Sequence, residues 1–157
     1  MFVSGENLDK RIAANYDALK KIVVRQTGSD IIATIDYDQF IVRDNLYTIV
    51  SQQERYSEEL LLGFLNSKFI NWYYQNIINN EVGEALAQVK RGHLIILPIP
   101  IHTANSDKEI EKLVTQILAA KKDNPDADTS ALEKEIDRLV YELYGLTEEE
   151  IKIVGGE

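Results

Sequence analysis

The sequence predicts an α/β (α+β) fold: a small mixed β-sheet packed on one long central helix, followed by an antiparallel helical hairpin. Three observations support this prediction. Runs of β-branched residues lie before residue 50, a wide apolar stripe with helical spacing covers residues 57–79, and two narrower helical stripes follow. We therefore expect a globular domain over residues 1–103 and a helical hairpin over residues 104–157 that acts as a spacer or docking element.

The predicted strands precede the central helix. Residues 13–19 can form a short helix, and the segments Ile22–Val24 and Ile31–Ile35 are rich in the β-branched residues that favour strands. Gly28-Ser29-Asp30 lies between these segments and is typical of a turn, so the two strands should form a hairpin. Residues 40–50 supply a further strand.

The central helix is the widest apolar element of the chain. Leu61, Leu65 and Phe69 follow one another at the i, i+4 spacing of a helix face. Ser57 suits the N-cap, and a helix of about 22 residues would be roughly 33 Å long. Small and polar residues interrupt the stripe at Asn66-Ser67-Lys68, where we expect a packing role and the close approach of another backbone.

A second apolar run, His93–Ile101, follows a basic turn at Val89–Gly92. This run predicts a strand that ends near Leu97, because proline cannot donate a hydrogen bond to a sheet ladder. The Pro-Ile-Pro segment should then lead the chain out of the globular domain in an extended conformation.

Two helices with narrow apolar seams are expected in the C-terminal third. The first seam begins at Ile110 and the second at Leu132, and the short loop between the helices predicts antiparallel packing. Ser130–Glu133 has the pattern of a capping box, and Gly145 suits the C′ position of the same helix. Thr147–Glu150 repeats the capping pattern and should open one last short helix.

The composition excludes several kinds of site. The chain has no cysteine, which rules out disulfides, thiolate zinc sites and cysteine nucleophiles, and its two histidines are too few for a histidine-rich metal site. No apolar run reaches the roughly 18 residues that a membrane helix needs, and the N-terminus lacks a signal-peptide pattern. A hydrophobic share of 45% and a mean hydropathy of -0.23 indicate a soluble protein, for which we expect a cytoplasmic location and no membrane partner.

Charge is unevenly distributed along the chain. The net charge is -9; residues 1–103 carry 10 basic and 12 acidic side chains, whereas residues 104–157 carry 7 and 14. The two parts therefore have net charges of -2 and -7. Because the globular part is nearly neutral, it can still present a local basic face, and the charge neither requires nor excludes a nucleic-acid partner.

Five residues at two turns are the best suited to contact DNA. They are Arg25, Gln26 and Thr27 at the hairpin tip, and Lys90 and Arg91 at the basic turn. Arginine and lysine bind phosphates or guanine edges, and glutamine can pair with adenine. Composition alone favours the simpler interpretation that both segments are ordinary solvated turns.

Two acidic patterns could indicate a metal site. Asp36, Asp38 and Asp44 could bind a hard cation, but their spacing is not that of a calcium loop, so solvated turn carboxylates are favoured. Pro125-Asp126 with Glu150-Ile151-Lys152 imitates a metal-dependent nuclease motif. The glutamates of that pattern follow an N-cap and predict a helix, whereas the nuclease chemistry needs them on a strand. We therefore predict no metal site.

No catalytic or nucleotide-binding motif is present. His93 and His102 have no partner serine, cysteine or paired carboxylate at recognisable spacing, and we expect them to be strand-end residues. The chain has no GxxxxGK[ST] phosphate loop, no GxGxxG fingerprint and no Asn-Pro-Pro-Tyr type motif. The residues alone indicate a domain with a helical hairpin and no catalytic residue.

Four segments resemble, in order, the TaqI-like C-terminal specificity domains, which lie at the end of DNA adenine methyltransferases and combined restriction–modification enzymes. The segments are KIVVRQTGSDIIATID (21–36), LLGFLNSKFINWYYQ (61–75), VKRGHLIILPIP (89–100) and EIDRLVYELYGLTEEEIKIV (135–154). Their order and spacing agree with the family over roughly residues 3–154. Type I restriction specificity subunits share the Leu-Asn-Ser-Lys and Pro-Ile-Pro features and are similar as well.

The resemblance implies a target-recognition domain, which reads a short sequence of double-stranded DNA while a separate domain flips and methylates adenine. It also implies that the chain is a C-terminal fragment. The methyltransferase domain, with its S-adenosylmethionine cofactor, and any endonuclease part would lie upstream in the same parent chain. The fragment itself would bind no cofactor, and its acidic hairpin would be a spacer held off the duplex.

Two other functions stay open at this point. A protein-interaction or dimerisation module would act through the helical hairpin and use the globular part as a scaffold. A small stand-alone hydrolase is disfavoured, because the chain lacks a recognisable nucleophile or metal constellation.

Overall fold

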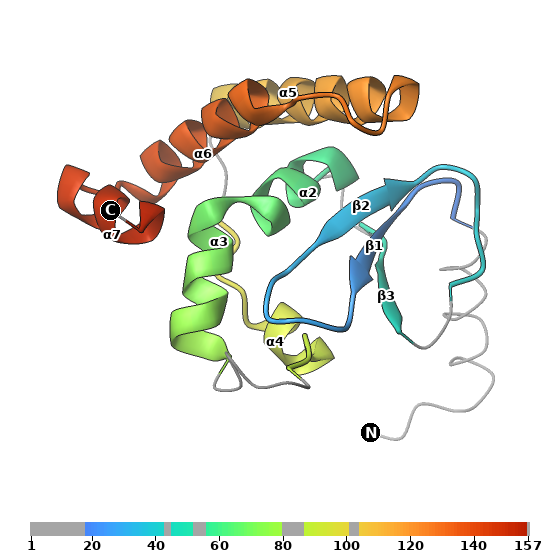
Figure 1. The fold of residues 1–157 in the computed structure, drawn as a ribbon, viewed down its shortest axis with the longest axis horizontal. Coiled ribbons are helices and arrows are strands. Elements are labelled where there is room, and N and C mark those ends of the chain that lie inside the picture. Colours follow the sequence, from blue (N-terminus) through green and yellow to red (C-terminus); the bar gives the residue numbers. More distant parts are fainter. Residues whose placement is uncertain (1–17, 43–44, 52–55, 80–86, 101–103, 157) are drawn as a thin grey trace.

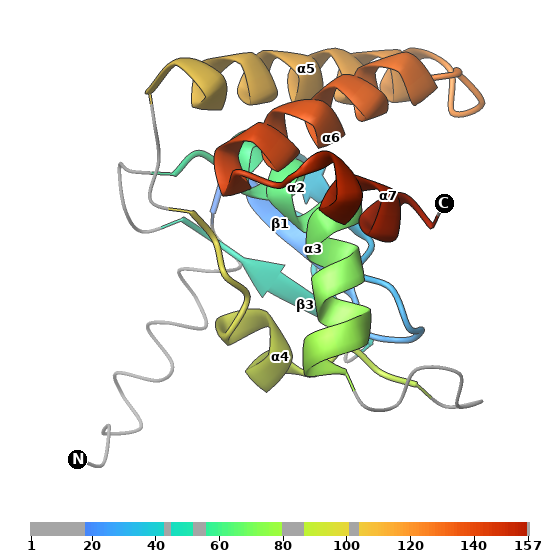
Figure 2. The same ribbon diagram turned by 90° about the vertical axis from the view of Figure 1, so that its left-hand side faces the viewer.

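The computed structural model describes residues 18–42, 45–51, 56–79, 87–100 and 104–156, and it confirms the α/β (α+β) class. A helical hairpin covers one side of the molecule, a small β-sheet lies on the other side, and two central helices lie beneath the hairpin and along the sheet (Figure 1). A second view shows one central helix between the helical hairpin and the sheet, while the other runs down beside the sheet (Figure 2). Most of the short helix predicted over residues 13–19 lies outside the described residues.

The sheet consists of strands β1 (Lys21–Arg25), β2 (Ala33–Asp36) and β3 (Leu46–Ile49), in the order β2-β1-β3. Val24 of the central strand lies opposite Ala33 of β2 and opposite Tyr47 of β3, and both pairings are antiparallel. Within the described residues the sheet is therefore antiparallel rather than mixed as predicted. The β1–β2 turn falls where the sequence predicts it, with Gly28 at φ 113°, a conformation that glycine adopts without strain.

The central helix is broken, so the prediction of one continuous helix over residues 57–79 is wrong. The chain forms α2 (Glu58–Asn66), α3 (Lys68–Tyr73) and the π-helix η1 (Tyr74–Ile78). Ser67 has an extended backbone (φ -66°, ψ 151°); its Oγ donates to the Phe64 carbonyl oxygen and accepts from the Ile70 N–H. Because serine bonds to nearby backbone groups, it ends α2 and caps α3 at once.

The described part of the apolar run, residues 93–100, does not form the predicted strand. Residues Arg91–Ile95 form the short helix α4, with Lys90 as its N-cap. The contact with the β1–β2 hairpin is made just before this helix, where Thr27 and Gln88 form an isolated antiparallel bridge. The chain thus contacts the β1–β2 hairpin at Gln88 and then forms helix α4, so it does not continue as a strand paired with the β-hairpin.

The C-terminal part consists of α5 (Ala104–Asp123), α6 (Ser130–Tyr144) and α7 (Glu148–Gly155). Helices α5 and α6 form the predicted antiparallel hairpin (Figure 1). Gly145 ends α6 in the left-handed conformation, and Thr147 begins α7 with a reciprocal capping box, both as predicted. The N-cap of α6 is Thr129 rather than Ser130, because the Ser130 N–H and hydroxyl both bond to Asp128. None of the described helices is both long and apolar enough to cross a membrane.

The helical hairpin formed by α5 and α6 packs closely on α2. A Cβ on Gly63 would lie only 2.5 Å from Cγ2 of Ile110, so α2 and α5 meet at this glycine. Farther along, the ring of Tyr144 lies 4.3 Å from the ring of Phe69, measured between centroids, and its hydroxyl donates to the Pro98 carbonyl oxygen. One hydrophobic core therefore contains residues of the sheet, the central helices and the hairpin. The division of the chain into two domains stays a prediction.

Candidate nucleic-acid interface

The tip of the β1–β2 hairpin is joined directly to the segment before α4. Two backbone hydrogen bonds join them, from Val89 N–H to the Gln26 carbonyl oxygen (2.8 Å) and from Gly28 N–H to the Ala87 carbonyl oxygen (2.9 Å), and together they form the antiparallel bridge between Thr27 and Gln88. The two turns that the sequence singles out are thus neighbours in space. Their relative position is fixed by backbone hydrogen bonds, which do not depend on any flexible side chain.

The hairpin tip exposes Arg25 and Thr27. The Arg25 guanidinium lies close to the turn, because a Cβ on Gly28 would be only 2.7 Å from its Nη2 atom. Gln26 is half-buried, and its Nε2 donates to the Tyr47 hydroxyl across 3.1 Å. Of the three candidate residues at this tip, Arg25 and Thr27 are accessible, whereas pairing of Gln26 with adenine would compete with its bond to Tyr47.

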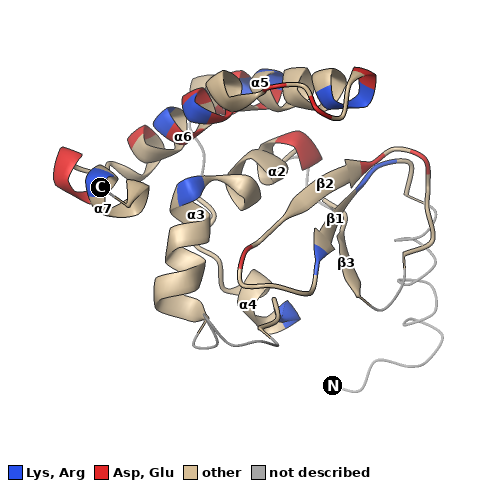
Figure 3. Ribbon diagram, viewed as in Figure 1, with Lys and Arg blue, Asp and Glu red and all other residues tan. Residues whose placement is uncertain are grey.

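Lys90 and Arg91 are exposed where α4 begins. Figure 3 shows basic residues at the end of β1 and on α4, at the same end of the molecule. Gln88, exposed beside Thr27, belongs to this surface but was not predicted, because one glutamine in a connector carries no signal until its bridge is known. We name the surface formed by Arg25, Thr27, Gln88, Lys90 and Arg91 the basic face.

Tyr74 supports the basic face from behind. Its side chain is fully buried, and its hydroxyl donates to the Gln88 carbonyl oxygen across 3.3 Å. The same hydroxyl oxygen lies 3.4 Å from Nδ1 of His93 in α4. His93 is therefore a helix residue with a buried partner rather than the predicted strand-end residue, and His102 lies outside the described residues.

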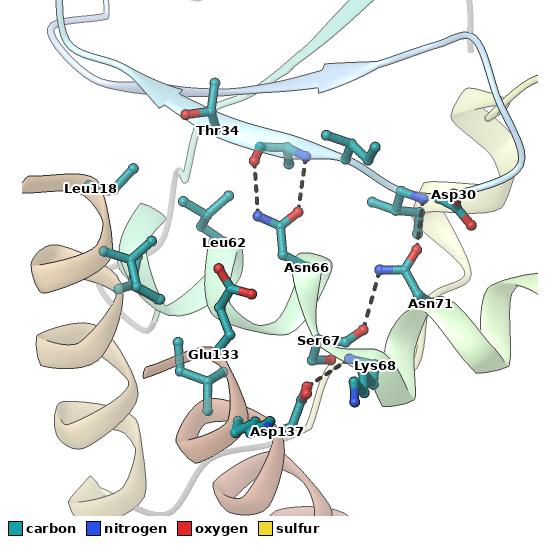
Figure 4. Close-up of a pocket in the computed structure, with 18 of the residues that line it drawn as sticks. Asp30, Thr34, Leu62, Asn66, Ser67, Lys68, Asn71, Leu118, Glu133 and Asp137 are labelled. Carbon is teal, nitrogen blue, oxygen red and sulfur yellow. Dashed lines mark hydrogen bonds between the residues drawn. The ribbon is translucent and has the colours of Figure 1, made fainter. Parts of the chain in front are cut away.

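Two asparagines hold the open edge of β2 (Figure 4). Asn66 Nδ2 donates to the Ala33 carbonyl oxygen (2.9 Å) and its Oδ1 accepts from the Ala33 N–H (3.0 Å). Asn71 Oδ1 accepts from the Ile31 N–H across 2.8 Å. The Asn66 amide takes the place of a neighbouring strand at the edge of β2, and Asn71 holds the segment just before that strand. The structure thus brings another backbone to Asn66 as expected, whereas Asn71 was not singled out from the sequence.

A groove of about 740 Å³ lies between β2, the α2–α3 junction and the hairpin (Figure 4). Its lining includes apolar residues such as Leu62 and Leu118, and the charged residues Lys68 and Glu133. Asp137 of α6 accepts the Lys68 N–H across 2.8 Å, which ties α3 to the hairpin. Burial raises the pKa of Asp137 above its usual value, and the Lys68 N–H offsets part of that rise.

Carboxylates of the sheet and α2 gather at the end opposite the basic face (Figure 3). Asp36 and Lys21 form a buried ion pair with 2.9 Å between Oδ2 and Nζ, and Lys20 pairs with Glu58 and Glu59. Burial by itself raises the pKa of Asp36, but the Lys21 ammonium and two backbone N–H groups outweigh burial and lower it below its usual value. These carboxylates are paired locally and lie away from the basic face.

The Asp36 carboxylate near β2 is used within the protein. The Asp36 carboxylate accepts hydrogen bonds from the N–H groups of Asp38 and Phe40, each across 2.8 Å. Asp44 lies outside the described residues. Within the described ranges, no group of three His, Asp or Glu side chains is arranged to hold a metal ion.

A cationic surface built from turns on a small α/β scaffold is an arrangement that suits a nucleic-acid-binding module. The family model for the TaqI-like C-terminal specificity domain matches residues 3–99. The chain belongs to this family, and the resemblance found in the sequence is confirmed over residues 3–99; the fourth segment, residues 135–154, lies outside the matched range. Membership implies a role in DNA sequence specificity within a restriction–modification enzyme. No curated protein matches the chain.

Proposed function

We propose that this chain is the target-recognition part of a DNA adenine methyltransferase or restriction–modification enzyme, and that its basic face contacts double-stranded DNA. In this proposal the methyltransferase domain, which binds S-adenosylmethionine, belongs to the parent enzyme upstream of the chain. The chain supplies the sequence preference, and the parent supplies the chemistry.

The observation that carries the proposal is the bridge between Thr27 and Gln88. The two backbone hydrogen bonds of this bridge hold Arg25 of the β-hairpin close to Lys90 and Arg91 at the start of α4. Arginine and lysine contact phosphates and guanine edges, and an exposed glutamine such as Gln88 can pair with adenine. A rigid scaffold that positions such loops is what selective binding requires.

The packing of the α5–α6 hairpin favours DNA recognition over the alternative function, a protein-interaction module. Its apolar seam is buried against α2 within the same chain, through residues that include Ile110, Val114 and Ile136. A partner that docked on that seam would have to displace α2. The surplus negative charge of residues 104–157 also lies in the layer farthest from the basic face (Figure 3), so it opposes DNA binding only weakly.

The proposal is tested with the full chain and a pool of random-sequence duplex DNA at low salt. We expect one short motif to be enriched, and we expect Lys90→Ala/Arg91→Ala to weaken binding to it. If both residues contact phosphates, the slope of log affinity against log salt should decrease by about 1.8. The matched control, Lys108→Ala/Lys122→Ala, removes the same charge from exposed positions of α5 and should leave the slope unchanged.

Two results would contradict the proposal. One is a pool from which no sequence is enriched. The other is a salt slope that changes equally for the α4 and α5 double variants, since this would show that only the overall charge of the chain matters.

A further inference from the structure

The outer side of α4 is unusually exposed for a short apolar helix. On its inner side, Leu94 packs against the hydrophobic core and His93 lies beside Tyr74. On its outer side, Ile95 is 68% exposed, and Ile96 just after the helix is 62% exposed. The helix is therefore held from behind while its large aliphatic side chains face solvent.

Gly92 occupies the first turn of α4, although nothing in the fold requires glycine there. It is not among the glycines with positive φ, and a Cβ at this position would meet no atom within 4 Å. Glycine weakens a helix relative to alanine, so stability alone favours another residue. Glycine in open space lets another molecule approach the backbone closely. Position 92 therefore suits a contact with a partner better than it suits the stability of the helix.

Arg91 and Ile95 are one helical turn apart and lie on the same side of α4. Because Arg91 belongs to the basic face, the exposed isoleucine is continuous with the surface proposed to bind DNA. The major groove offers a partner to both kinds of side chain: guanine presents acceptors to arginine, and thymine presents a methyl group. A helix about 10–12 Å wide also fits a groove about 12 Å wide.

We propose that the outer face of α4, formed by Arg91, Gly92 and Ile95, enters the major groove and helps to determine the bound sequence. Ile95 contacts the methyl group of a thymine and is a specificity-determining residue. Gly92 is a positioning residue, because the absence of a side chain lets the groove approach the helix. This inference rests on the proposed function and adds to it an apolar contact that the pattern of charges does not indicate.

The test of Ile95 uses the motif that the full chain selects. Each thymine of the motif is replaced in turn by deoxyuridine, which lacks only the methyl group. For the unmodified chain, one replacement should weaken binding about tenfold, the size of one lost base contact. Ile95→Ala should bind the original motif about tenfold more weakly, and the same replacement should then have no further effect.

The test of Gly92 separates binding from folding. Gly92→Leu replaces glycine with a better helix former, and its Cβ has open space in the free protein, so we expect a urea midpoint no lower than that of the unmodified chain but binding weakened about tenfold for every duplex. Gly92→Ala is a milder version that should raise the urea midpoint and still weaken binding. Both variants thus move affinity and stability independently.

Helix α7 offers matched controls. Ile153 is 59% exposed there, and a Cβ on Gly155 would also meet no atom within 4 Å. Ile153→Ala and Gly155→Leu should therefore bind DNA as the unmodified chain does.

The inference is overturned if Ile95→Ala and Gly92→Leu bind the selected motif with unchanged affinity. It is equally overturned if no thymine of the motif is sensitive to deoxyuridine, even when Ile95→Ala weakens binding, because Ile95 then reads no methyl group. A pool without any enriched sequence would instead contradict the proposed function itself, so the two failures are distinguishable.

Discussion

Replacing Asn71 tests how the hairpin is held on the broken central helix. The Asn71 amide makes three hydrogen bonds: it accepts from the Ile31 N–H at 2.8 Å and donates to the carbonyl oxygens of Leu65 at 3.2 Å and Ser67 at 3.3 Å. The first bond joins the segment just before β2 to α3. The other two join α3 to the end of α2, so one side chain connects three segments.

The cost of Asn71→Ala follows from these bonds. At about 1 kcal/mol each, with less for the two longer ones, their loss should lower the free energy of unfolding by about 2–3 kcal/mol. With an m-value of about 2 kcal/mol per M, the urea midpoint should fall by about 1 M. The measurement is a urea titration followed by circular dichroism.

Asn71→Asp gives the same reasoning a pH dependence. The new carboxylate could still accept from the Ile31 N–H but would face the carbonyl oxygens of Leu65 and Ser67. Its pKa in the folded state should therefore rise above the unfolded value of about 3.9. A raised folded-state pKa costs stability above the unfolded pKa, and this cost disappears as the pH falls. The variant should thus recover part of its stability, relative to the unmodified chain, between pH 7 and about pH 4.

Asn76→Ala is the matched control. Asn76 is exposed at the end of the same helical segment, and its Nδ2 donates only within that segment, to the Trp72 carbonyl oxygen. We expect a change below about 0.5 kcal/mol. The reasoning is refuted if Asn71→Ala costs no more than Asn76→Ala.

Further predictions concern packing and buried charge. Gly63→Val should lower the unfolding free energy by about 2–3 kcal/mol, because even a Cβ there lies 2.5 Å from Ile110; an unchanged urea midpoint would show that α5 can move away. Asp36→Asn leaves the Lys21 ammonium buried without its partner and should cost about 3–5 kcal/mol at pH 7. Because the folded-state pKa of Asp36 is lowered, the stability that its carboxylate contributes is present above the unfolded-state pKa and is lost as the pH falls through the folded-state pKa. Urea titrations at pH 7 and pH 3 should therefore show that Asp36→Asn is less destabilised, relative to the unmodified chain, in acid. Asp137→Asn keeps an oxygen for its backbone partner and removes a carboxylate whose pKa burial raises, so it should raise the urea midpoint at pH 7, and this gain should vanish as the pH falls; a lower midpoint at pH 7 would contradict this.

The sequence predicts those parts of the fold that depend on local patterns. β-Branched runs locate β1 and β2, and a glycine marks their turn, since each of these signals lies within a few residues. The capping patterns place Gly145 and Thr147 correctly for the same reason. The apolar stripe finds the central helix but not its break, because periodicity records which residues are apolar and not how Ser67 uses its hydroxyl.

The misplaced strand has a different cause. A short apolar run such as residues 93–97 can form a strand or part of a helix, so pattern alone cannot separate the two. The hairpin partner, Gln88, lies just before that run and is polar. For the candidate site, the residue types predict both turns, but not that the turns are neighbours in space, because that depends on the long-range bridge between Thr27 and Gln88. Tyr74, which holds that union from behind, looks in the sequence like one more apolar member of a helix.

The central claim, that the basic face binds DNA, is tested most directly by mapping the contact in solution. The full chain, labelled with ¹⁵N, is titrated with the selected duplex, and backbone amide shifts are followed by NMR. We predict that the largest changes fall on residues 25–28 and 88–92, with little change in α5, α6 and α7. Shift changes concentrated on the α5–α6 hairpin or around the groove beside β2, with the basic face unaffected, would contradict this claim.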